Sequence, residues 1–150
     1  MVDSRDKGSR GENVVKKALR DLTGLDWQRT PGSGALHEKH KLKGDLYVPD
    51  KQNLWCVECK NYKDDHISSK ILTDKVPQIF HWWEQTLRQG EQVNREPLLI
   101  FKFDRSKLFC AFQVMPESHL PFLYVSRNGY EFYIALLEEW IKMETPKFVA

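Results

Sequence analysis

Asp45, Glu58 and Lys60 combine two carboxylates and an amine at a spacing that could support metal-dependent chemistry. Short β-prone runs at 46–48 and 54–57 flank a turn-rich segment, which predicts a β-hairpin. Pairing of these two strands would bring Asp45 close to Glu58. Because side chains alternate along a strand, Glu58 and Lys60 would project from the same face. The two acids and the lysine would then share one surface.

This combination of groups suits the hydrolysis of a phosphodiester. Mg²⁺ needs few carboxylates from a protein when phosphate oxygens and water complete its octahedral shell. The ion polarises the phosphoryl group and lowers the pKa of bound water, and a nearby lysine can position that water or offset charge in the transition state. The same spacing also fits an exposed hairpin in which Asp45 is a turn residue and Glu58 and Lys60 form a surface pair.

A helix predicted at residues 9–22 could contribute a third acid. Apolar residues recur in this segment at helical spacing. Ser9 and Glu12 match a capping box, which would explain Glu12 without any chemistry. Glu12 also borders the helix face that must pack on the sheet, and a carboxylate turned inward needs a metal or a basic group as its partner. Both interpretations stay open.

A first strand at 27–30 leads into a glycine-rich loop at 31–34. The glycines permit close approach of the backbone, and Ser33 offers a hydroxyl and an amide to a phosphate, although a plain turn has the same composition. The following segment, 37–43, is polar and basic and predicts a loop that faces nucleic acid. The first 43 residues carry ten Lys or Arg against six Asp or Glu, which fits a surface that holds a polyanion beside a metal centre.

Cys56 and Cys59 form a CxxC pattern of the kind found in zinc and redox sites. On a strand the two sulfurs would project to opposite faces and could not share an ion or form a disulfide. The sequence contains no second CxxC that would supply two further ligands. Three cysteines, with no apolar signal-like segment at the start, favour reduced thiols and a cytoplasmic location. The apolar runs are too short to cross a membrane.

The rest of the chain predicts further elements of one domain spanning 1–150. A helix is expected at 74–89, with Asp74 as its cap and Gly90 as its stop. Trp82 falls outside the buried stripe of this helix. That stripe consists of Val76, Ile79, Phe80, Trp83 and Leu87.

Two inner strands are predicted after this helix, at 97–103 and 108–112. The Asn128-Gly129 pair is a strong turn signal and predicts a hairpin between 122–125 and 130–134. A closing helix should follow from about Leu136 to Ile141.

Four motifs, taken in chain order, resemble those of the PD-(D/E)XK nuclease superfamily and, more closely, of its archaeal-type Holliday-junction resolvases. Lys7-Gly8-Ser9-Arg10-Gly11-Glu12 resembles the KGSxxE start of that family. Arg29-Thr30-Pro31-Gly32-Ser33-Gly34 resembles its R-x-P-x-SG loop. Gly44-Asp45 stands where the family has Pro-Asp, and Glu58-Cys59-Lys60 stands where it has Glu-Val-Lys.

The resemblance covers residues 7–105 and implies a fold of the α/β class. The expected architecture is a restriction-endonuclease-like core, in which helices flank a central mixed β-sheet. Residues 106–150 would add a C-terminal hairpin and helix to this core.

The resemblance also implies roles for individual residues. Asp45 and Glu58 would bind Mg²⁺, which Mn²⁺ could replace, with the Cys59 carbonyl as a further ligand. Glu12 would complete the site, Lys60 would act at the attacking water, and Ser33 would lie beside them. The expected DNA-binding residues surround these motifs: Lys7, Arg10, Arg29, Ser33, Lys39, Lys41 and Lys43.

The predicted function is that of a Mg²⁺-dependent endodeoxyribonuclease that resolves four-way (Holliday) junctions in DNA recombination and repair. Two symmetry-related cuts need two active sites, and one chain supplies one set, so a homodimer on branched DNA is expected. Candidate interface residues are Trp82 and the C-terminal aromatics Phe122, Tyr124, Tyr130, Phe132 and Tyr133. Two alternatives stay open: a repair or restriction-like nuclease acting on duplex or flap DNA, and a catalytically silent DNA-binding module.

Overall fold

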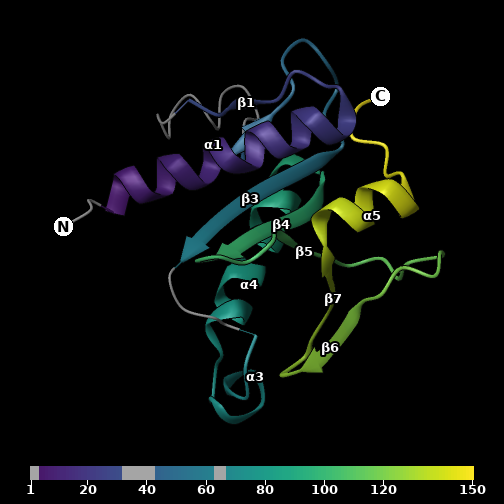
Figure 1. Cartoon of the computed structure of the whole chain (residues 1–150). Coiled ribbons are helices and arrows are strands. Elements are labelled where there is room, and N and C mark those ends of the chain that lie inside the picture. The colour runs from purple at the N-terminus through teal and green to yellow at the C-terminus, as the bar shows by residue number, and fades with distance from the viewer. Residues whose placement is uncertain (1–3, 32–42, 63–66) are drawn as a thin grey trace.

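The computed structural model of the chain describes residues 4–31, 43–62 and 67–150, with side chains from residue 10 onward (Figure 1). No helix within these ranges combines the length and the apolar character needed to cross a membrane. The elements in chain order are α1 (Ser4–Thr23), β1 (Gln28–Arg29), β2 (Leu46–Tyr47), β3 (Trp55–Tyr62), α3 (Lys70–Thr73), α4 (Gln78–Val93), β4 (Glu96–Phe103), β5 (Phe109–Phe112), β6 (Leu123–Arg127), β7 (Tyr130–Leu136) and α5 (Leu137–Glu144).

One mixed sheet contains all the described strands, in the order β1-β2-β3-β4-β5-β7-β6. Strands β3 and β4 pair in parallel at its centre, and the other neighbours pair antiparallel. A parallel pair needs a crossover connection, and α4 supplies it. The strands that follow residue 105 extend this same sheet, so the C-terminal addition is continuous with the central strands.

Helices cover both faces of the sheet, as alternate residues of β4 demonstrate. Leu98 and Ile100 belong to a hydrophobic core beneath α1 and α5. Leu99 and Phe101 belong to a second core beneath α4. Figure 1 shows α1 and α5 lying across the sheet, apart from α4. The predicted fold class is therefore confirmed: a restriction-endonuclease-like α/β architecture with a central mixed sheet, flanking helices and a C-terminal hairpin and helix.

Helix α1 is longer than the sequence pattern predicted, because it begins at Ser4. Ser9 consequently lies inside the helix and cannot be its N-cap, so the capping-box interpretation of Glu12 is wrong. The buried side of the helix is as predicted, since Val15 and Leu19 are buried against the sheet. Glu12 therefore borders a packed helix face and needs another explanation.

Helix α4 is shifted relative to the predicted range of 74–89. Pro77 has an extended backbone and occupies the N-cap position, so Asp74 does not cap the helix and Val76 lies outside it, exposed. At the other end, Gly90 lies within the helix, and Asn94 forms the C-cap in the left-handed conformation, with φ 53°. The predicted start and stop were wrong by a few residues, because Pro77 and Asn94 set the ends.

Two of the predicted interface aromatics are buried inside the chain. Trp82 is only 3% exposed, and its ring stacks on Tyr62 at a centroid distance of 4.8 Å. Phe132 is completely buried. The buried face of α4 is wider than the predicted stripe and includes Trp82 as well as Trp83, as expected for a helix that lies on a broad sheet. Trp82 and Phe132 are therefore core residues, and their prediction as interface residues is wrong.

The predicted hairpin around Asn128-Gly129 is confirmed. Strands β6 and β7 pair antiparallel up to Arg127 and Tyr130. Asn128 and Gly129 both have positive φ, 55° and 79°, which is the conformation of a two-residue hairpin turn.

Gly44→Ala should destabilise the protein more than Gly129→Ala. Both glycines have positive φ, but a Cβ on Gly44 would lie 2.7 Å from the Val57 carbonyl oxygen, whereas a Cβ on Gly129 would have no heavy atom within 4 Å. We expect the free energy of unfolding to fall by about 2–4 kcal/mol for Gly44→Ala and by about 1 kcal/mol for Gly129→Ala. Urea denaturation measures both values, and equal losses would contradict the close backbone approach at Gly44.

Candidate active site

The predicted hairpin of β2 and β3 brings Asp45 beside Glu58. Leu46 pairs with Val57 in antiparallel register, and the Asp45 N–H donates to the Val57 carbonyl over 2.6 Å. The Asp45 carboxylate accepts a hydrogen bond from the backbone N–H of Cys59 at Oδ2, over 2.7 Å. This bond holds the carboxylate against the backbone of β3, next to the Glu58 side chain.

Asp45 and Glu58 form a carboxyl pair that is poorly solvated. Glu58 is 4% exposed, and Asp45 is half-buried. Burial is the main cause that raises the pKa of Asp45 to about 6 and that of Glu58 to about 8. The hydrogen bond between the two carboxyls raises the pKa of Glu58 and lowers that of Asp45, so Glu58 is the carboxyl that keeps the proton.

Lys60 lies close to this pair, as its place two residues after Glu58 on one strand predicts. Its positive charge lowers the pKa of both Asp45 and Glu58. Burial nevertheless prevails, and both pKa values remain raised. A further positive charge is therefore needed to stabilise two ionised carboxylates here, and a divalent cation would provide it.

Glu12 approaches the site from α1, but Arg29 holds its carboxylate. The Arg29 Nε donates to Glu12 Oε2 over 2.8 Å. Glu12 and Lys60 line the same small pocket, and the charge of Glu12 helps to raise the pKa of Asp45 and Glu58. Within residues 4–31, 43–62 and 67–150, no group of three or more His, Cys, Asp or Glu side chains could hold a metal. The described site is thus a carboxyl pair with Glu12 beside it.

The donor set fits a hard divalent cation such as Mg²⁺ or Mn²⁺. Asp45 and Glu58 supply oxygen ligands, which these ions prefer. The Cys59 side chain packs against the core beneath α1, and strand alternation places Cys56 on the opposite face. All three cysteines are free thiols.

Gly44, directly before Asp45, explains why this chain lacks the proline that the family motif has. Its φ is 87°, an angle that a proline ring cannot adopt. Its N–H also donates to Gln89 Oε1 over 3.1 Å, and proline has no N–H. The glycine therefore permits a contact between the start of β2 and helix α4.

A pocket of about 290 Å³ opens between the carboxyl pair and α4. Four polar side chains of α4 line it, and we call them the polar ridge: Gln85, Arg88, Gln89 and Gln92. Lys43 and Gly44 complete its lining. None of the ridge residues was predicted as part of the site. Their helical spacing is visible in the sequence, but only the packing of α4 on the sheet shows that this side of the helix faces the acids.

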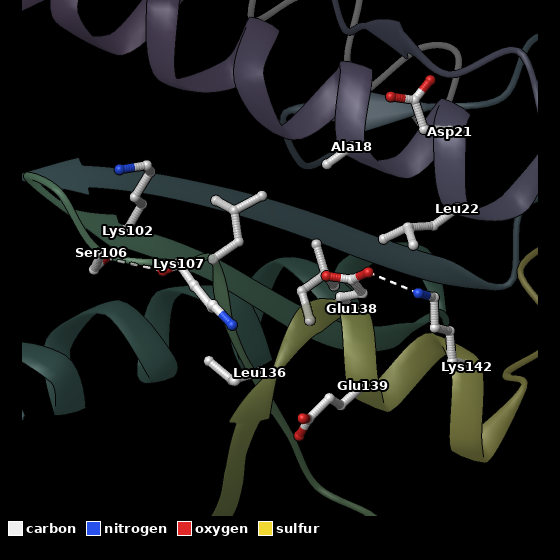
Figure 2. A pocket seen from close by; sticks show the side chains of 12 residues that line it. Ala18, Asp21, Leu22, Lys102, Ser106, Lys107, Leu136, Glu138, Glu139 and Lys142 are labelled. Carbon is white, nitrogen blue, oxygen red and sulfur yellow. Dashed lines mark hydrogen bonds and ion pairs between the residues drawn. The ribbon is translucent and has the colours of Figure 1, made fainter.

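A larger pocket, of about 690 Å³, lies elsewhere, between α1 and α5 (Figure 2). Three acids, Asp21, Glu138 and Glu139, and three lysines, Lys102, Lys107 and Lys142, line it together, and Glu138 pairs with Lys142 over 2.7 Å. Neither Asp45 nor Glu58 lines it. Its size therefore does not identify the site of chemistry.

The predicted DNA-binding residues have different outcomes. Arg10 is exposed on α1, Arg29 binds Glu12, and Lys43 lines the pocket beside Asp45 and Glu58. Four predicted groups lie outside the described part of the structure: the Lys7 side chain, Ser33, Lys39 and Lys41.

Comparisons with known proteins agree with the predicted superfamily. The chain matches the family described as phage putative PDDEXK endonuclease over residues 3–149. Protein D14 of Escherichia phage T5 is 41% identical over 151 residues, which cover 93% of this chain and 92% of that protein.

Among solved structures, Hjc, a Holliday junction resolvase from Archaeoglobus fulgidus, aligns over 91% of this chain and 89% of its own, with 13% sequence identity and a TM-score of 0.43. That similarity is too low to transfer a function. The family match, in contrast, spans both strands of the hairpin and the carboxyl pair. The chain therefore belongs to the phage putative PDDEXK endonuclease family.

Proposed function

We propose that this protein is a metal-dependent endodeoxyribonuclease that cuts four-way DNA junctions. The observation that carries the proposal is the poorly solvated carboxyl pair, Asp45 and Glu58, which lines a pocket beside α4 and feels the charge of nearby Lys60. Clustered acids with raised pKa values are costly in a fold and are typical of functional sites. Membership of an endonuclease family supports the same chemistry.

Asp45 and Glu58 would hold Mg²⁺ or Mn²⁺, with the Cys59 carbonyl as a further ligand. When bound, the metal would polarise the phosphoryl group and lower the pKa of a water molecule. The Cys59 N–H orients the Asp45 carboxylate before any ligand arrives, so little reorganisation is needed. Lys60 would position the attacking water and offset negative charge at the phosphate. Glu12, next to the pair, would complete the site.

The junction specificity of the proposal depends on a homodimer. Each chain provides one carboxyl pair, and paired cuts need two. The open edge of β6 is the proposed contact surface, because β6 pairs only with β7 among the described strands. Leu123 and Tyr124 on this strand are 52% and 51% exposed. An apolar edge strand is prone to pair with another chain, and a second copy would cover it.

Asp45→Asn and Glu58→Gln should each abolish cleavage, because each removes a charged ligand of the proposed metal. We expect the single-turnover rate on labelled DNA in Mg²⁺ to fall by at least about 100-fold, and Mn²⁺ binding measured by calorimetry to weaken. Glu139→Gln, an exposed carboxylate on α5, is the matched control and should behave like the wild type. Wild-type cleavage by either site variant would contradict the assignment.

The metal-free protein should lose stability as the pH rises from about 4 to about 8. The unfolded chain releases the two carboxyl protons at the lower end of this range, whereas folded Asp45 and Glu58 retain them up to about pH 6 and 8. The protonated pair therefore contributes its full stabilisation below about pH 4, and this contribution is lost as the pH rises to about 8. We expect the free energy of unfolding to fall by at least about 2 kcal/mol over this range.

Urea denaturation at several pH values, with a chelator present, measures this loss. The double variant Asp45→Asn, Glu58→Gln lacks both titrating groups and should show a flatter profile. An identical slope for the wild type and the double variant would contradict the raised pKa values. Added Mg²⁺ should stabilise the wild type most at the alkaline end, where the carboxyls are ionised.

Light scattering should show a dimer that Leu123→Glu converts to a monomer, because a buried charge on the β6 edge opposes pairing. The variant should cut one strand of a four-way junction but lose the paired second cut. Leu72→Glu, at an exposed apolar residue of α3, is the control. A wild-type monomer, both with and without junction DNA, would favour a single-site nuclease on duplex or flap DNA instead.

A further inference from the structure

We propose that the polar ridge of α4 binds the DNA backbone next to the reacting phosphate, with Arg88 as the cation that positions it. The proposal rests on the function proposed above and adds a substrate contact to the same site. No motif of the superfamily named in the sequence analysis includes α4. The contact would therefore be a feature of this chain's own helix.

The ridge and the carboxyl pair share one pocket. Gln85, Arg88 and Gln92 line it together with Asp45 and Glu58. Side chains separated by three, four or seven residues lie on one side of a helix, which explains how α4 presents several of them to the same space. A phosphate that reaches Asp45 through this pocket therefore places a neighbouring part of the backbone along α4.

Gln89 ties this helix to the catalytic hairpin. Its Oε1 accepts a hydrogen bond from the Gly44 N–H over 3.1 Å, one residue before Asp45. The buried residues of α4, including Trp83 and Thr86, fix the other side of the helix against the sheet. The distance between the ridge and the carboxyl pair is thus set by the fold, as a positioning contact requires.

Arg88 is available to bind an anion although two acids lie within helical reach. Glu84, four residues earlier, accepts a hydrogen bond from the Tyr130 hydroxyl over 2.9 Å. Glu91, three residues later, lines a different pocket. Among the ion pairs of the described residues, none includes Arg88 or Lys43. The exposed guanidinium of Arg88 therefore keeps its donors for a ligand.

The chemistry of the pocket walls indicates a phosphate diester as that ligand. A guanidinium presents paired N–H donors that match two phosphate oxygens, and the neighbouring glutamine amides offer further donors. The floor of the pocket is acidic at Asp45 and Glu58, so an anion binds best at the wall formed by Arg88 and Lys43. We therefore assign the reacting phosphate to Asp45 and Glu58, where a bound metal cation would neutralise the acids. A flanking phosphate of the same strand is assigned to the polar ridge.

Arg88→Ala should weaken DNA binding mainly through lost counterion release. The measurement is fluorescence anisotropy of a labelled four-way junction and its matching duplex in Ca²⁺, over a range of salt concentrations. We expect the slope of log K against log salt to decrease by about 1. Lys147→Ala, an exposed cation of the C-terminal segment that packs beneath α5, is the control and should keep the wild-type slope.

The position of the contact is tested by neutralising single phosphates on either side of the mapped cut with methylphosphonate. If Arg88 binds one of these phosphates, neutralising that phosphate and replacing Arg88 with Ala should each lower the affinity for DNA. The two losses of binding free energy should then not be additive when the changes are combined. Arg88→Lys should keep the salt slope but lower the single-turnover rate, because one ammonium lacks the planar pair of donors. Additive losses at every position, or an unchanged slope for a folded Arg88→Ala protein, would overturn the proposal.

The two proposals fail in different ways. The nuclease function would be refuted if the wild-type protein cut no DNA in Mg²⁺ or Mn²⁺. The ridge would still be supported as a DNA contact if Arg88→Ala lowered the slope of log K against log salt by about 1. Wild-type protein that cuts DNA, with Arg88→Ala binding and cutting equally well, would refute the ridge alone.

Discussion

The close approach of two desolvated carboxyls, Asp45 and Glu58, is the constraint on which the rest of this structure depends. Burial disfavours their ionised forms, and the negative charge of Asp45 further raises the pKa of Glu58. A flexible segment would relieve the repulsion by moving the groups apart. Here the Asp45 carboxylate is bound to the β3 backbone at Cys59, and β3 lies between β2 and β4 inside the sheet. The pair is therefore held in place by the interior of the sheet.

Positive groups surround this pair from different elements. Lys60 comes from the same strand, while Arg29 reaches Glu12 from β1 and Arg88 approaches on α4. The acids therefore lie at the centre and the cations at the periphery. This arrangement suits a polyanion bound across an acidic site. Phosphates on either side of the site can contact the basic side chains, while a metal ion neutralises the acids at the centre.

The C-terminal part of the chain helps to hold the β2–β3 hairpin. The Leu54 N–H donates to the Phe148 carbonyl over 2.9 Å, and the Trp55 indole N–H donates to the Lys147 carbonyl over 2.9 Å. Trp55 also packs edge-on against Trp140 of α5, at a centroid distance of 5.4 Å. The segment after residue 105 is therefore more than an appendage, since it supports the start of β3, the strand that carries Glu58 and Lys60.

The sequence by itself determined the features that depend on neighbours along the chain. The hairpin that joins Asp45 to Glu58 and the turn at Asn128-Gly129 follow from turn residues and β-prone runs, because such signals act over a few residues. The central strands were predictable for the same reason. The ordered motifs also predicted the superfamily and the fold class, since they preserve the spacing of the acids.

Only the tertiary structure decided what depends on residues far apart in the chain. The partner of Glu12 is Arg29, and Trp82 is buried against Tyr62; neither contact has a local signal in the sequence. The ridge on α4 is an ordinary polar helix side until the sheet places it opposite Asp45. Long-range packing between layers decides which side of a helix meets which strand, and helical or strand periodicity carries no information about that choice.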